Sequence, residues 1–118
     1  MKNFLFIICS FITLTSRAQT ITIQQAKDSI DRKATVCDVV KEVYVSQNGT
    51  TLINFGASYP NQVFSAVIFF QNESLLSYPP QTLKGKTICV TGIVKDYKGK
   101  PQIEILDEKQ IEIKGDTK

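Results

Sequence analysis

The chain of 118 residues contains no histidine. Histidine is the commonest general base near neutral pH and the commonest metal ligand, so its absence removes the usual nucleophile–base pairs. The three cysteines lie far apart, at positions 9, 37 and 89, and do not have the spacing of a zinc site. Carboxylates such as Asp28, Asp31 and Glu104 are scattered through segments expected to be exposed. We therefore predict no catalytic residue, no metal and no cofactor, and we do not expect an enzyme.

Residues 1–18 have the composition of a secretory signal peptide. Lys2 supplies a positive start, residues 4–14 form an apolar core, and Ser16 and Ala18 are small residues at the two positions that determine cleavage. We predict cleavage after Ala18 and a mature protein in the periplasm or outside the cell, without a membrane span. The alternative is a membrane anchor, but the apolar run is shorter than the roughly 20 residues that a span requires.

Cleavage at this position changes the charge and the cysteine count. It removes Lys2 and Arg17, so the formal charge falls from +3 to +1, and binding to a polyanion then depends on where the lysines lie. It also removes Cys9 and leaves Cys37 and Cys89. An even pair in an exported domain favours a disulfide. The alternative is two small buried side chains that stay reduced.

Residues 84–105 have the pattern of two strands joined by a turn. Larger apolar side chains alternate with smaller or polar ones over residues 87–91, and Gly92 then permits a bend or bulge. Lys98-Gly99-Lys100-Pro101 is a turn cluster, after which residues 102–105 alternate again. A long strand that bends at a glycine suits a small closed barrel, because a flat strand cannot wrap around its own sheet.

Three more strands are expected upstream. Residues 34–45 and 50–55 are rich in β-branched side chains and are joined by Asn48-Gly49, which predicts a hairpin. Alternation in the second of these strands places Ile53 and Phe55 in the core and points Leu52 and Asn54 outward, whereas Tyr44 is compatible with either face. Residues 63–70 form a third strand that is apolar on both faces, so its outer face is either covered or a binding patch.

Helical structure is expected only in short pieces. Thr22 and Gln25 match a capping box, which predicts a helix of about two to three turns that ends near Asp31. Between residues 71 and 82, Asn72 is a possible N-cap and the Pro79-Pro80 pair a stop, which predicts a short helix or a turn.

The run GKTICVTGIVKDYKGKPQIEI, residues 85–105, resembles the fourth and fifth strands of an OB-fold of the tRNA-anticodon and helicase-associated nucleic-acid-binding type. Residues 35–40 resemble the first strand of that family and residues 51–56 the second. The resemblance implies an all-β chain, with a five-stranded Greek-key barrel over residues 33–113. A polar segment with a short helix, 19–32, would precede it, and a polar tail, 114–118, would follow. It also implies that Cys37 and Cys89 lie on neighbouring strands.

The candidate site follows from the same resemblance and from the placement of lysines. Basic residues cluster around Tyr97 within seventeen positions: Lys84, Lys86, Lys95, Lys98 and Lys100. Residues 95–100 match the loop between the fourth and fifth strands, which is one of the loops that OB-folds use to grip oligonucleotides or oligosaccharides. Lysines interleaved with an aromatic ring suit a groove for phosphates and bases. Leu52 and Asn54 match positions on the binding face of the family, where an aromatic residue commonly stands in place of Leu52.

The sequence therefore predicts weak binding of single-stranded nucleic acid, or of another polyanion, by these residues. A second hypothesis is a protein- or glycan-binding module of the cell envelope that uses the apolar third strand. The two hypotheses differ in salt response, since polyanion binding weakens steeply with salt and apolar contact does not. A third interpretation of the lysines is a solvated hairpin whose charges discourage edge pairing.

Overall fold

A computed structural model describes residues 18–116, so the predicted signal peptide, apart from Ala18, lies outside the described residues. The described strands are β1 (Gln19–Ile21), β2 (Lys33–Val45), β3 (Thr51–Phe55), β4 (Phe64–Ile68), β5 (Lys86–Tyr97), β6 (Lys100–Glu104) and β7 (Ile111–Asp116). Between them lie the 3-10 turns η1 (Ala26–Asp28), η2 (Phe70–Asn72), η3 (Pro80–Leu83) and η4 (Glu108–Gln110). None of these helical pieces is long and apolar enough to cross a membrane.

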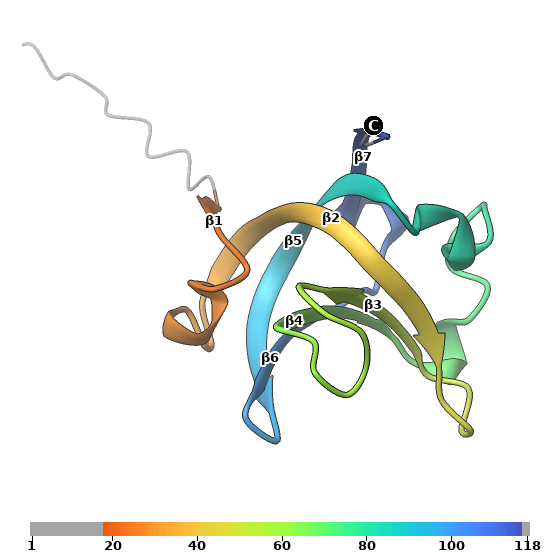
Figure 1. Ribbon diagram of the computed structural model, residues 1–118, viewed down its shortest axis with the longest axis horizontal. Helices are drawn as coiled ribbons and strands as arrows, with labels where there is room; N and C mark the ends of the chain where they lie inside the picture. The colour runs from red at the N-terminus through yellow and green to blue at the C-terminus, as the bar shows by residue number, and fades with distance from the viewer. Residues whose placement is uncertain (1–17, 117–118) are drawn as a thin grey trace, which may run out of the picture.

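Five of the strands close a barrel, in the order β2, β3, β4, β6, β5 and back to β2. All neighbours are antiparallel except β4 and β6, which run parallel. Figure 1 shows β2 curving over the other strands, which lets one strand pair with β5 along its first half and with β3 along its second. This arrangement is the five-stranded Greek-key barrel of an OB-fold and confirms the predicted fold class.

Two local irregularities bend the long strands. In β2 the pairing register shifts between Val40 and Glu42, where the strand changes partner from β5 to β3. In β5 the change from β7 to β6 takes place around Gly92. A Cβ atom at Gly92 would lie 2.6 Å from Ile103 Cγ2 and 3.0 Å from Gln110 Nε2, so only glycine lets these elements approach so closely. The close packing explains the glycine at this position, whereas the register shift in β5 lies between Thr87 and Ile88, where it pairs with β7.

The barrel interior holds the inward half of each alternating strand. Ile53 and Phe55 are fully buried, as predicted, and Phe55 contacts Phe64 of β4 with ring centroids 5.6 Å apart. On β4, alternation sends Phe64, Ala66 and Ile68 into the core and turns the intervening side chains outward. Because the core takes every second residue of β3, β4 and β6, the outer face of these three strands is left for other contacts.

A disulfide joins Cys37 of β2 to Cys89 of β5, as predicted. The two residues are direct partners in the antiparallel ladder, with Cα atoms 4.0 Å apart. Their neighbours Val36, Ile88 and Val90 point into the core, so the sulfur atoms lie on the outer side of the barrel wall. The bond therefore links the two strands whose pairing closes the barrel.

The N-terminal segment is less helical than its capping box predicts. The reciprocal hydrogen bonds form, since Thr22 N donates to Gln25 Oε1 at 2.9 Å and Gln25 N donates to Thr22 Oγ1 at 3.1 Å. Only one 3-10 turn, η1, follows. The chain must reverse before β2, and it does so at Asp31, whose φ is 68° and whose N–H donates to Val94 O. The helical structure therefore ends at Asp28, before the predicted end near Asp31, and a left-handed residue at Asp31 cannot continue it.

Two strands extend the sheet beyond the barrel. β1 pairs in parallel with the start of β2, and β7 pairs antiparallel with β5. β1 lies in the predicted polar segment and was not predicted as a strand. β7 continues to Asp116, past the predicted domain end at residue 113. Each is short or weakly patterned, and its pairing partner is far away in the sequence, so local alternation gave little signal.

Candidate ligand-binding groove

A cavity of about 360 Å³ lies on the outer face of the barrel, over β3, β4 and β6. Its walls come from the end of β2 and the β2–β3 loop, from residues 59–62, and from the β5–β6 turn. Aromatic rings and lysines line it, and no carboxylate does, since its aromatic and charged members are Tyr44, Tyr59, Phe69, Tyr97, Lys98 and Lys100. We call this cavity the aromatic groove.

A stacked pair of tyrosines forms one wall of the aromatic groove. The rings of Tyr44 and Tyr59 have centroids 4.4 Å apart and planes within 4° of parallel. Tyr59 is 47% exposed, so the pair presents an aromatic face to solvent. Tyr44 is the cross-strand partner of Leu52, a residue that the sequence had assigned to the binding face. The aromatic platform missing at Leu52 is thus supplied by its neighbour, and cross-strand pairing was the signal that would have found Tyr44.

Glu42 holds the loop that carries Tyr59. Its Oε1 accepts hydrogen bonds from Tyr59 N at 3.1 Å and from Asn54 Nδ2 at 3.5 Å. Hydrogen bonds from the Ser58 side chain and from the Tyr59 backbone lower the pKa of the Glu42 carboxyl below 4.5. The ionised form of Glu42 is therefore the one that fixes the stacked tyrosine wall.

The sequence predicts that Asn54 points outward and contacts the ligand, and the exposure that this requires is not found in the structure. The side chain does point away from the core residues Ile53 and Phe55, but it is fully buried. Its Oδ1 accepts a hydrogen bond from Ser65 Oγ at 2.7 Å, and Glu42 accepts one from its Nδ2. Alternation predicts the direction of a side chain, but only the folded loop decides whether something covers it. Asn54 thus supports the groove from beneath.

We expect Glu42→Gln to remove a pH-dependent part of the stability. Because the folded-state pKa of Glu42 is lowered, its contribution is complete above pH 4.5 and is lost as the pH falls through the lowered value. Wild-type protein should therefore melt at a higher temperature than the variant at about pH 7, and the two should converge once the pH falls below the lowered pKa of Glu42. Melting curves across this range measure the effect. A difference between the two proteins that stays constant with pH would contradict it.

Two of the five predicted lysines line the aromatic groove. Lys98 and Gly99 occupy a tight turn with φ values of 51° and 84°. This backbone places the Lys98 ammonium 5.3 Å from the centroid of the Tyr97 ring, a cation–π contact. Lys100 donates from Nζ to the main-chain oxygen of Gln62 at 3.1 Å and so ties β6 to the loop after β3. Tyr97 is 56% exposed and is available to a ligand.

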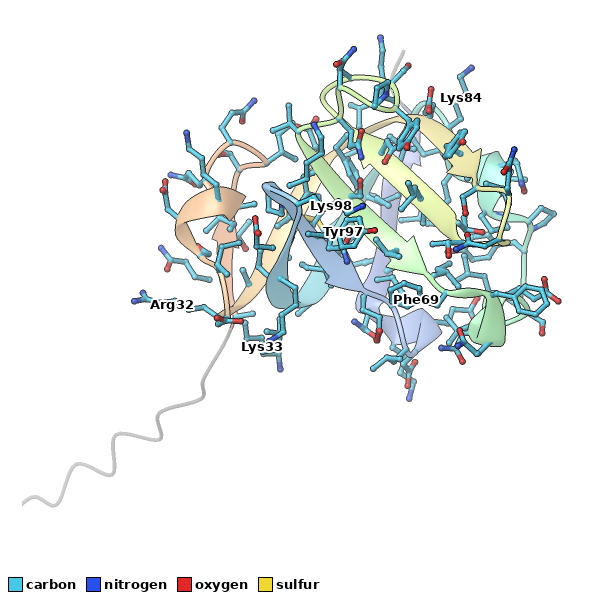
Figure 2. All side chains as sticks on the ribbon, turned by 90° about the horizontal axis from the view of Figure 1, so that it is seen from below. Arg32, Lys33, Phe69, Lys84, Tyr97 and Lys98 are labelled. Atoms are coloured by element: carbon cyan, nitrogen blue, oxygen red, sulfur yellow. A yellow bond between two sulfur atoms is a disulfide. The ribbon has the colours of Figure 1, made fainter. Side chains whose placement is uncertain are left out.

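The other three lysines lie elsewhere. Lys95 forms an ion pair with Asp31 at 3.0 Å and lines a different cavity. Lys86 begins β5, roughly 36 Å along the strand from Tyr97 at about 3.3 Å per residue. Lys84 precedes β5, and Figure 2 shows it at the upper edge of the molecule, away from Tyr97 and Lys98. The predicted five-lysine site is thus divided, because neighbours in sequence are spread along an extended strand.

No metal site is visible in the described part of the chain. Among residues 18–116 there is no group of three or more histidine, cysteine, aspartate or glutamate side chains that could hold an ion. The two cysteines of this range are consumed by the disulfide. The aromatic groove is lined by aromatic rings, side-chain amides, hydroxyls and ammonium groups.

Comparison with known proteins supports the fold. The chain resembles asparaginyl-tRNA synthetase from Pyrococcus horikoshii, with a TM-score of 0.56 and 14% identity, over 86% of this chain and 24% of that one. A putative aspartyl-tRNA synthetase from Leishmania major Friedlin gives 0.54 and 8%, over 90% of this chain and 22% of the synthetase. The OBody AM1L10, solved bound to hen egg-white lysozyme, gives 0.53 and 14%, over 84% of this chain and 96% of the OBody.

These likenesses and the barrel topology define the chain as an OB-fold module with a ligand-sized groove on its outer face. The chain spans about a quarter of the length of the synthetases, so the likeness concerns the fold of one part of them. No protein-family model matches the sequence, and no curated protein matches it.

Proposed function

We propose that this protein is an exported OB-fold module that binds single-stranded nucleic acid in the aromatic groove. The observation that carries the proposal is the meeting, in one cavity without a carboxylate, of the stacked tyrosines with Tyr97 and two lysines. A base can stack on an exposed tyrosine ring, and a phosphate is attracted to an ammonium group. Export is supported by the disulfide, since such bonds persist in oxidising compartments.

A protein or glycan ligand is the second candidate. The OBody with a similar fold was solved bound to lysozyme, so a barrel of this shape can present a protein-binding face. Exposed apolar side chains lie just after β4, the strand that the sequence predicts as the third, where Phe69 is 36% and Phe70 is 56% exposed. The outer face of β4 itself is covered, since its outward residue Val67 is only 1% exposed. Phe69 and Phe70 are therefore the residues that this second candidate would use.

Salt dependence distinguishes the two candidates. We expect a fluorescein-labelled single strand to bind more weakly as salt rises, and Lys98→Ala with Lys100→Ala to flatten the log–log slope by about 1.4, at about 0.7 per phosphate contact. The matched control is Lys84→Ala with Lys86→Ala, which removes the same charge outside the groove and should leave the slope unchanged. Fluorescence anisotropy at several salt concentrations measures both.

Two results would reject nucleic-acid binding in the groove. One is the absence of binding at low salt by the unaltered protein. The other is an equal effect of the two lysine pairs, which would mean that only net charge matters. Because Lys100 also ties β6 to the loop after β3, melting curves of each variant should accompany the titrations.

A further inference from the structure

A second cavity of about 710 Å³ lies beside the aromatic groove, along β5 and β6 and against η4. Phe69 and Gln102 line both cavities. The outward side chains of β6 form one row through them, because Pro101, Ile103 and Ile105 turn inward while Lys100, Gln102 and Glu104 turn outward. The two cavities are thus neighbours along the outward row of β6. We call the second one the adjoining cavity.

We propose that a single strand bound in the aromatic groove continues past Phe69 into the adjoining cavity. This inference rests on the proposed function and extends it, since it assigns a second segment of the same ligand to a surface that the sequence did not single out. In Figure 2, Lys33 and Phe69, which both line the adjoining cavity, lie below Tyr97 and Lys98 of the aromatic groove.

The side chains of the adjoining cavity suit alternating bases and phosphates. Its apolar members are unusually open to solvent, with Leu106 63%, Ile93 44% and Phe69 36% exposed, and they offer apolar surface to bases. Lys33 and Lys109 also line it, and both residues are exposed. These two ammonium groups are the ones we assign to phosphates.

The remaining charges of the adjoining cavity are compatible with this assignment. Lys95 is held by Asp31 in an ion pair. The carboxylate of Asp107 accepts a hydrogen bond from Lys109 N at 2.8 Å and caps η4. Glu104 lies on the central row of β6, where a carboxylate can accept a hydrogen bond from a base amino group. The carboxylate of Glu104 thus lies where bases are expected. Lys33 lies on β2, on the other side of β5 from the outward row of β6.

The test compares oligodeoxycytidylates of about 5 and about 15 nucleotides, lengths near the two ends of the range that one OB-fold covers, because cytosine carries the amino group that Glu104 can accept from. A longer strand gains affinity from extra binding registers alone, so the diagnostic quantity is the effect of a variant on each length. Lys33→Ala with Lys109→Ala should weaken binding of the long strand by about 25-fold at 0.1 M salt and flatten its salt slope by about 1.4. The short strand should bind as before.

The control is Lys27→Ala with Lys41→Ala, which removes two exposed lysines that line neither cavity. Equal weakening of both lengths by the Lys33 and Lys109 changes, or no weakening of either, would overturn the continued path and leave the aromatic groove intact. If neither length binds the unaltered protein at low salt, the proposed function itself fails, and this inference fails with it.

Discussion

Removing the bond between Cys37 and Cys89 is expected to lower the free energy of unfolding by up to about 4 kcal/mol. The bond closes a loop of 52 residues, and the chain-entropy model assigns about that much to a loop of this length. It also joins β2 to β5, the pair that closes the barrel. A domain of about 100 residues has a total stability of only about 5–15 kcal/mol, so the loss is a large fraction of it.

Thermal unfolding measures this effect. Each kcal/mol corresponds to about 4–8 °C for a domain of this size, so the melting temperature of Cys37→Ala with Cys89→Ala should fall by up to about 16–32 °C. Adding a reductant should lower the melting temperature of the wild type to a similar degree and leave the double variant unchanged, which controls for other effects of the reductant. If Cys37 and Cys89 are both alkylated in the folded, air-oxidised protein, the disulfide is absent and the expectation is wrong.

Tyr59→Ala is expected to weaken nucleic-acid binding by about 5- to 150-fold. Stacking of a base on an aromatic side chain contributes about 1–3 kcal/mol. Tyr59 is the outer ring of the stacked pair, because 47% of its surface is exposed, whereas its partner Tyr44 is half-buried. Tyr59→Phe keeps the ring and should bind almost as the wild type does. Anisotropy titrations at low salt give the two dissociation constants.

The control for Tyr59 is another exposed aromatic side chain outside the groove. Phe70 is 56% exposed and lines neither cavity, and Phe70→Ala should leave the affinity unchanged. A loss of affinity in Phe70→Ala as large as that in Tyr59→Ala would show that the stacked pair has no special part in binding. A Tyr59→Ala protein that binds as well as the wild type would show the same.

The sequence was informative where the signal is local. Alternation in β3 and β6 and the Asn48-Gly49 and Lys98-Gly99 turns each act through the backbone of a few neighbouring residues, and the structure has them as predicted. The pairing of Cys37 with Cys89 was also predicted, because the resemblance supplied the order of the strands. Export remains a proposal, since its main signal lies in residues 1–18.

The candidate site shows the opposite case. Five lysines within seventeen residues looked like one cluster, yet the extended β5 separates Lys84 and Lys86 at its start from Lys98 and Lys100 beyond its end, and only the latter two reach the aromatic groove. Tyr44 and Tyr59 are fifteen residues apart and meet because Glu42 fastens the loop after β3.

By itself, therefore, the sequence determined the main strands and turns, because periodicity and backbone preference act over a few residues, and its resemblance to OB-folds supplied the barrel order and the cysteine pair. Only the tertiary structure decided that Asn54 is covered, that Tyr44 stacks on Tyr59, and that Phe69 lines two neighbouring cavities. These features depend on how segments distant in the chain pack together around the closed barrel, and no local pattern records that packing.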